Sequence, residues 1–139
     1  MTSWKNNNTL YSMRESGEGK VIVKDKDHLR DLIMDRMGKE GRYCDLNDLD
    51  VSQITDMSYL FSRSEFNGDI SKWDVSKVDN MNSMFYGSYF NGNISGWNVI
   101  NVKHANQMFA HSKFNSYIGD WRFRSLESGD EMFWGTNFN

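Results

Sequence analysis

The 139-residue sequence lacks the features that define several protein classes. It has a single cysteine, Cys44, which excludes an internal disulfide framework. It has no run of about 18 apolar residues, so we expect no transmembrane helix. The net charge of −3 argues against a generic binder of nucleic acid or of anionic membranes. Because the N-terminal stretch lacks the apolar core of a signal peptide, we expect a cytoplasmic protein.

From residue 45 onward, a 24-residue pattern recurs four times without a gap. The aligned positions are Leu49, Trp73, Trp97 and Trp121; Phe61, Phe85, Phe109 and Phe133; and Phe66, Phe90, Phe114 and Phe138. A fixed period of this length indicates an array of stacked repeats, and we expect the aromatic columns to form its core. We predict one domain with a polar N-terminal segment (1–19), an N-terminal cap (20–44) and repeats at 45–68, 69–92, 93–116 and 117–139.

The residues before the repeats predict a strand followed by a helix. Residues 20–24 form a short apolar run between lysines, which is typical of a strand. Asp25 or Asp27 can cap the N-terminus of a helix, and Gly38 or Gly41 can end it. Arrays of repeats need such a cap, since the first repeat would otherwise expose its apolar side.

Within each repeat, two apolar patterns follow one another. Ile70, Trp73 and Val75 illustrate the LxxLxL pattern of a strand and turn. Met81, Met84 and Phe85 then follow the i, i+3, i+4 spacing of one helix face. We therefore predict an α/β fold: a right-handed, leucine-rich-repeat-like solenoid with a parallel sheet of about five strands, one short helix per repeat and a strand–helix N-terminal cap. The last strand, at about 118–123, would be the edge of that sheet.

No group of residues suggests catalysis. His104 and His111 are two helical turns apart, about 10 Å, which is too far for one metal ion. We expect both, and His28, to lie on the surface, and Cys44 to be a buried apolar residue. A reactive Cys44 thiol would need electropositive neighbours.

The densest acidic cluster lies at the start of the first repeat and comprises Asp45, Asp48, Asp50 and Asp56. A calcium site is the alternative there, but the glycine and terminal glutamate of an EF-hand loop are missing. We expect a solvated acidic face instead.

The positions between the apolar residues of LxxLxL are expected to stack from repeat to repeat on the outer face of the sheet. The predicted protein-binding residues on this face are Asp48, Asp50, Lys72, Asp74, Asn98, Ile100, Arg122 and Arg124. Their charge changes from acidic at the N-terminal side to basic at the C-terminal side. Repeat arrays bind partners along such faces. An equal alternative is that these residues only keep the sheet soluble.

The segment ISKWDVSKVDNMNSMFYGSYFNG at residues 70–92 resembles the repeat of the BspA-like leucine-rich-repeat family of bacterial and phage proteins. The matching residues are Asp74, Val75, Ser76, Val78, Met81, Met84, Phe85, Phe90, Asn91 and Gly92. The first repeat matches with Leu49 in place of Trp, and the fourth departs from the pattern after Trp121. The resemblance covers residues 45–139 and implies the repeat fold and, from secreted members of the family, binding of host proteins.

Together these observations predict a non-catalytic protein-binding module without a cofactor or metal. We expect it to act inside the cell, with an inhibitor of a host protein complex, encoded by a phage or other mobile element, as one specific form. The alternative is a short form or fragment of a bacterial surface adhesin. A hydrolase or metal-dependent enzyme is a third hypothesis, which tightly bound stoichiometric metal would support. The expected partner is a protein, with no nucleic acid and no membrane, and a homodimer could form through the edge of the C-terminal repeat.

Overall fold

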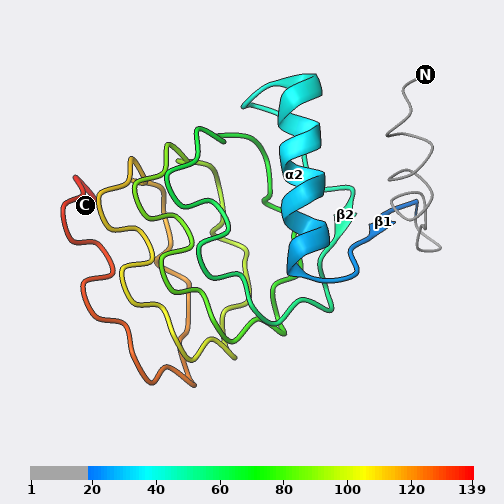
Figure 1. The fold of residues 1–139 in the computed structure, drawn as a ribbon. Helices are drawn as coiled ribbons and strands as arrows, with labels where there is room; N and C mark the ends of the chain where they lie inside the picture. Colours follow the sequence, from blue (N-terminus) through cyan, green and yellow to red (C-terminus); the bar gives the residue numbers. More distant parts are fainter. Residues whose placement is uncertain (1–18) are drawn as a thin grey trace.

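A computed structural model describes residues 19–139, in which a short strand and one helix precede a stack of coils, and a two-stranded sheet joins that strand to the first coil (Figure 1). Strand β1 (Val21–Ile22) pairs in parallel with β2 (Leu49–Asp50), and helix α2 (Lys26–Glu40) lies between them in the chain. The predicted N-terminal segment 1–19 lies outside these residues except for Gly19.

Helix α2 has a defined cap at each end. The Asp25 carboxylate accepts a hydrogen bond from the His28 N–H at 2.8 Å, and the Gly41 N–H donates to the Met37 carbonyl at 2.8 Å. Gly41 has a φ of 88°, a conformation that glycine adopts without a Cβ clash. The inner face of α2 buries Leu29 and Ile33 at the N-terminal end of the stack.

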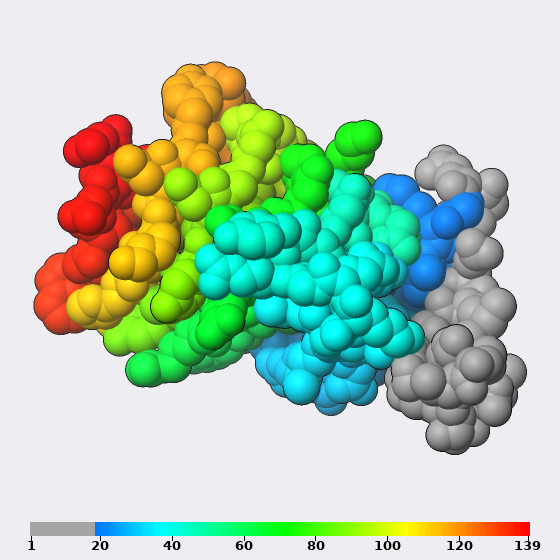
Figure 2. Space-filling view, turned by 90° about the horizontal axis from the view of Figure 1, so that it is seen from above, coloured from blue at the N-terminus to red at the C-terminus, as the bar shows by residue number. Residues whose placement is uncertain are grey.

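The four repeats form four stacked coils, which we number 1 to 4 (45–68, 69–92, 93–116 and 117–139). Figure 2 shows them from above, running from the N-terminal cap to the red C-terminal coil at the opposite end. Alternate backbone N–H groups of one coil donate to carbonyls of the next. From coil 1 to coil 2 the donors are Met57, Tyr59, Phe61 and Arg63, and the acceptors are Asn80, Asn82, Met84 and Tyr86, at 2.6–3.0 Å. The same pattern recurs between coils 2 and 3 at 2.7–2.9 Å and between coils 3 and 4 at 2.8–2.9 Å.

The predicted fold class, an α/β leucine-rich-repeat-like solenoid with one short helix per repeat, is wrong. Within residues 19–139 the only helix is α2, and the segments expected to be helical are runs of overlapping turns. In coil 1 the Leu60 N–H donates to the Met57 carbonyl at 3.3 Å and the Ser62 N–H to the Tyr59 carbonyl at 3.1 Å. Tyr59 and Arg63 have φ values of 62° and 58°, which an α-helix cannot contain.

The reason for this error is that two backbones fit the same apolar spacing. Met57, Leu60 and Phe61 are all buried, as a helix face would be. In a helix, however, every N–H bonds to the carbonyl four residues earlier in the same segment. Here the N–H groups of Met57 and Phe61 bond to the neighbouring coil instead. The hydrophobic pattern does not distinguish these two arrangements.

The predicted parallel sheet of about five strands is also wrong. In the described part of the chain the sheet has two strands of two residues each. Beyond it, the coils share only isolated parallel bridges, at Asp45–Asp69, Asp56–Asn80, Asn80–His104 and His104–Ser128. The LxxLxL segments turn too tightly for a strand, because the N–H of each central Leu or Trp bonds to the carbonyl three residues earlier at 3.1–3.2 Å. The expected edge strand at 118–123 is one of these turns.

Three columns of aromatic side chains fill the core, as predicted. Phe61, Phe85, Phe109 and Phe133 stack at 5.4–5.5 Å between ring centroids with interplanar angles of 0–5°. A second phenylalanine column stacks at 6.0–6.2 Å, and the tryptophans from Trp73 to Trp121 stack at 6.4 Å. Each indole N–H donates to a carbonyl of the preceding coil at 2.9–3.0 Å. The columns are buried through coil 3, and in coil 4 Trp121 is still buried while Phe133 and Phe138 are partly exposed.

Candidate protein-binding face

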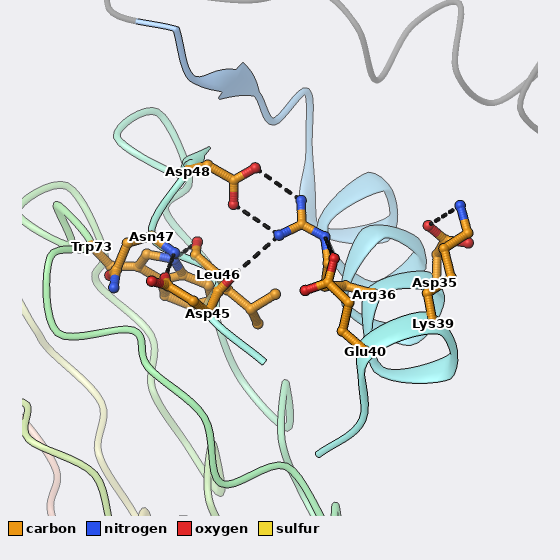
Figure 3. A network of polar contacts seen from close by, with 9 residues as sticks. All are labelled: Asp35, Arg36, Lys39, Glu40, Asp45, Leu46, Asn47, Asp48 and Trp73. Carbon is orange, nitrogen blue, oxygen red and sulfur yellow. Dashed lines mark hydrogen bonds and ion pairs between the residues drawn. The ribbon is translucent and has the colours of Figure 1, made fainter. Parts of the chain in front are cut away.

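The predicted binding face divides into two halves with different surroundings. Its N-terminal half lies beside the cap. Asp48 accepts two hydrogen bonds from the Arg36 guanidinium, each at 2.9 Å, so this pair ties coil 1 to α2 (Figure 3). Arg36 also donates to the Asp45 carbonyl at 3.0 Å. The bond to Asp48 raises the pKa of Arg36. Asp48 therefore contacts the cap, although its side chain remains 44% exposed.

The middle of the predicted face consists of polar side chains that fold back on their own backbone. Asp50, Asp74 and Asn98 each accept a hydrogen bond from the N–H two residues later, at 3.0–3.1 Å. The Ser76 hydroxyl adds a second bond to Asp74 at 2.6 Å and, as the largest cause, lowers the pKa of Asp74. Short side chains with this geometry stabilise tight turns. These three residues thus have a structural role at the corners of coils 1 to 3.

Lys72 lies on the same face, with an exposed side chain. The Lys72 backbone N–H donates a hydrogen bond to the Asn47 side-chain oxygen of the preceding coil at 2.8 Å. Lys72 does not line the groove that contains Arg122 and Arg124, which is described next.

At the C-terminal half, coils 3 and 4 enclose a shallow groove of about 400 Å³, which we call the arginine groove. Four predicted residues line it, together with Asp120 and the small residues Ser95 and Gly96. The four are Asn98, Ile100, Arg122 and Arg124. Ile100, predicted to be exposed, is half-buried.

The two arginines of this groove form no ion pair within residues 19–139, although the Asp120 carboxylate lines the same groove. Arg122 donates to the carbonyls of Gly119 and Trp121 at 3.3 and 3.0 Å. Asp120 lies in the groove but accepts only from the Tyr117 hydroxyl, at 3.4 Å. The groove thus offers two guanidinium groups to a carboxylate or another anion. Asp120 is also an outward position of the LxxLxL pattern, equivalent to Asp48 and Lys72, but it was not among the predicted binding residues.

The remaining candidates of the sequence analysis are distributed over the molecule. Cys44 is buried as predicted, and burial raises the pKa of its thiol. His28, predicted to be on the surface, is buried, and burial lowers its pKa. The prediction failed because His28 lies in the first turn of α2, where its ring accepts a hydrogen bond from the Lys24 N–H at 2.8 Å. His104 bonds to the Ser128 hydroxyl at 3.0 Å, and His111 is exposed.

The expected acidic face of coil 1 is largely occupied by internal contacts. Asp45 accepts from the Asn47 N–H at 2.8 Å, and Asp56 accepts from the Ser58 N–H at 2.8 Å and from Lys26 at 3.4 Å. Across residues 19–139 no three His, Cys, Asp or Glu side chains are arranged to hold a metal ion. None of the helices in that range is long and apolar enough to cross a membrane.

A second surface cluster was missed by sequence reasoning. The Arg42 guanidinium lies over the rings of Tyr43 and Tyr89, at 5.1 and 5.3 Å from their centroids, and both rings are exposed. The three residues do not occupy equivalent positions of the repeat, so no ladder in the sequence connects them. Only the stacking of coil 2 beside the end of the cap brings Tyr89 to Arg42.

Comparison with known proteins adds a family but no named function. No curated protein and no solved structure matches the chain. The resemblance to BspA-like repeats stays a prediction. A family model described as "Mycoplasma protein of unknown function, DUF285" matches residues 33–139, which include part of α2 and all four coils. The chain therefore belongs to the DUF285 family.

Proposed function

We propose that this protein is a non-catalytic protein-binding module that acts inside the cell and takes an acidic segment of its partner into the arginine groove. The observation that carries this proposal is the pair Arg122 and Arg124, two exposed cations that line one groove without a carboxylate partner in the described residues. Arginine is enriched in protein interfaces and pairs with carboxylates through two parallel hydrogen bonds.

The shape of the groove supports a polypeptide partner. Ser95 and Gly96 carry little side-chain volume, so a backbone can approach closely. The half-buried Ile100 provides an apolar contact at the same site. The groove floor is rigid, because Trp97 and Val99 belong to the buried core. A preformed floor reduces the entropy that binding would otherwise cost.

The test is an affinity capture from bacterial lysate, read by mass spectrometry, with the double variant Arg122→Glu/Arg124→Glu. A matched control, Lys103→Glu/Lys113→Glu, makes the same change in charge at two exposed lysines outside the groove. We expect a partner that the native protein and the lysine control capture and the arginine variant loses. Retention by all three proteins, loss from both variants, or no partner would each contradict the proposal.

Once a partner is identified, its acidic segment gives a sharper test. Reversal of both arginines should weaken binding by roughly 10- to 100-fold, as expected for charged contacts at the centre of an interface. The affinity of the native protein should also fall as salt concentration rises, because the groove is open to solvent. Isothermal titration calorimetry at two salt concentrations measures both effects.

A further inference from the structure

The arginine groove carries an ordered pattern of charges along its coil 4 wall. Asp120, Arg122 and Arg124 are exposed and line the groove. Between them, Trp121 is buried and Phe123 is partly buried against the core. Because inward and outward side chains alternate, the wall presents one carboxylate and then two guanidinium groups, at every second residue.

The outward direction of these positions is a property of the repeat. In coil 2, Lys72 and Asp74, the equivalents of Asp120 and Arg122, are exposed as well, and Trp73 between them is only 4% exposed. The alternation is therefore a conformation that an inner coil shares, and only the order of charges is specific to coil 4.

The stacking of coil 3 on coil 4 divides the groove into three pairs of side chains. Each pair consists of a coil 3 residue and its equivalent 24 residues later. From first to third, the pairs are Gly96 with Asp120, Asn98 with Arg122, and Ile100 with Arg124. The pairs follow one another along the groove, and each can contact a different kind of side chain.

The second pair offers hydrogen-bond donors from both coils. Arg122 uses only Nη1 within its own coil, and its Nε and Nη2 have no acceptor within residues 19–139. The Asn98 side-chain oxygen accepts from the Ile100 N–H at 3.1 Å, which leaves the amino group of the same amide for a ligand. Nε and Nη2 form one edge of a guanidinium, which can pair with both oxygens of a carboxylate. The second pair therefore fits an acidic side chain.

The third pair combines a cation with an apolar surface. Arg124 is exposed and has no ion pair in the described part of the chain, and Ile100 beside it is half-buried. A glutamate fits this pair better than an aspartate, because its longer methylene stem can cover Ile100 while its carboxylate reaches Arg124.

The first pair has the opposite charge. The Asp120 carboxylate accepts only a long hydrogen bond from the Tyr117 hydroxyl, at 3.4 Å. Gly96 is exposed, and a Cβ added there would meet nothing within 4 Å, so the coil 3 wall is open at this point. A long basic side chain can pass over Gly96 to Asp120, whereas an acidic side chain would be repelled.

We propose that the arginine groove selects an extended segment of its protein partner that carries a basic residue and two acidic residues at alternate positions, with the basic residue at one end of the pattern. This inference rests on the proposed function, which places an acidic segment in the groove without fixing its pattern. In an extended segment, side chains two residues apart lie on the same side and about 6.5 Å from each other, which is the alternation of the coil 4 wall. The basic residue lies opposite Asp120 whichever way the segment runs.

The test compares three capped peptides in NMR titrations of the full ¹⁵N-labelled chain. Lys-Ser-Glu-Ser-Glu has its basic residue at one end, Glu-Ser-Lys-Ser-Glu has the same composition with the basic residue between the acids, and Glu-Ser-Glu-Ser-Glu has none. The amides of Gly96 and of residues 119–124 report binding at the groove. Low ionic strength is used, because exposed charges are then screened least.

We expect the first peptide to bind most tightly. Its affinity should exceed that of the second peptide by roughly three- to tenfold, since the second places its lysine opposite Arg122 in either direction. It should also exceed that of the third peptide, whose additional glutamate faces Asp120.

Two matched variants assign this preference to the first pair. Asp120→Asn should weaken the first peptide and strengthen the second, so that the ratio of their affinities falls at least about twofold. Asp130→Asn makes the same change in charge at an exposed position of coil 4 outside the groove, and should leave both affinities unchanged.

The outcomes separate this pattern from the proposed function. Equal binding of the first two peptides, tightest binding of the third, or a ratio that Asp120→Asn leaves unchanged would each overturn the pattern. In those cases an acidic peptide that still shifts the groove amides keeps the proposed function. Absence of binding by all three peptides up to about 10 mM, far weaker than specific recognition, would overturn both.

Discussion

The two ends of the stack have the same repeated backbone but different environments. At the N-terminal end, α2 and β1 cover coil 1, and its phenylalanines Phe61 and Phe66 are completely buried. Polar contacts hold this cover in place, through Arg36 with Asp48 and Lys26 with Ser58. At the C-terminal end, coil 4 leaves Phe133 and Phe138 partly exposed. Because interfaces between neighbours stabilise repeat arrays, we expect coil 4 to contribute less to stability than the coils that are covered on both faces.

We expect the largest loss of stability from a substitution at the centre of the aromatic column that contains Phe85. Phe85→Ala should lower the free energy of unfolding by about 3–5 kcal/mol, because the ring is completely buried between two others. Phe133→Ala, at the equivalent position of coil 4, should cost only about 1–2 kcal/mol, since its outer face is open. Urea unfolding of both variants measures the difference. Equal losses would mean that the end of the stack is as well packed as its centre.

Removing the polar contact between cap and stack should have an intermediate effect. Arg36→Ala deletes the paired hydrogen bonds to Asp48 and the bond to the Asp45 carbonyl, and should cost about 1–2 kcal/mol after allowance for partial solvent exposure. The control is Lys39→Ala on the same helix, whose ion pair with Asp35 at 3.4 Å is more exposed and should contribute less than about 0.5 kcal/mol. Thermal unfolding by circular dichroism distinguishes them. A cap that is held by apolar packing alone would give the same small loss for both.

A smaller effect on stability, which depends on pH in only one of two equivalent turns, is expected at the Asp69–Ser71 and Asn93–Ser95 turns. The Ser71 hydroxyl donates to Asp69 at 2.7 Å and, as the largest cause, lowers the pKa of Asp69 from its ordinary value of 3.8. One repeat later, Ser95 donates to Asn93 at 2.7 Å, and Asn93 does not titrate. A carboxylate whose pKa is lowered by folding stabilises the folded state at pH values above its ordinary pKa. This stabilisation is lost as the pH falls through the lowered pKa.

Ser71→Ala should therefore cost roughly 0.5 kcal/mol at pH 7 and less at pH 2–3, whereas Ser95→Ala should cost the same at both. The Asp69 pKa, followed by NMR titration, should rise toward its ordinary value in Ser71→Ala. If the two serine variants show the same pH dependence, the hydroxyl does not control the Asp69 carboxylate.

The smallest effect on stability is expected at the arginine groove. Arg122→Glu/Arg124→Glu should change the free energy of unfolding by no more than about 0.5 kcal/mol, since both side chains are exposed and form no ion pair within residues 19–139. Urea unfolding checks this value. A large loss would assign these arginines to the fold rather than to a partner, and would remove the main support for the proposed function.

The candidate site was only partly predictable from the sequence. The ladder of outward positions correctly placed Asn98, Ile100, Arg122 and Arg124 on one surface. It also included Asp48, whose partner Arg36 comes from the cap. A repeat pattern describes how coils relate to each other and contains no information on what α2 places beside them. For the same reason, the Arg42 cluster with its two tyrosines was not found.

The sequence by itself determined the period of the array, its aromatic columns and the buried set of Met, Val and Ile side chains. These follow from the spacing of apolar residues, which depends on burial alone. Only the tertiary structure decided that the repeats are runs of turns rather than helices. A backbone N–H can bond within its own segment or to a neighbouring coil, and this choice depends on whether a stacked coil lies beside it. Within the turn segments that choice joins the N–H groups of one coil to the carbonyls of the next, as from Met57 to Asn80 and from Phe61 to Met84.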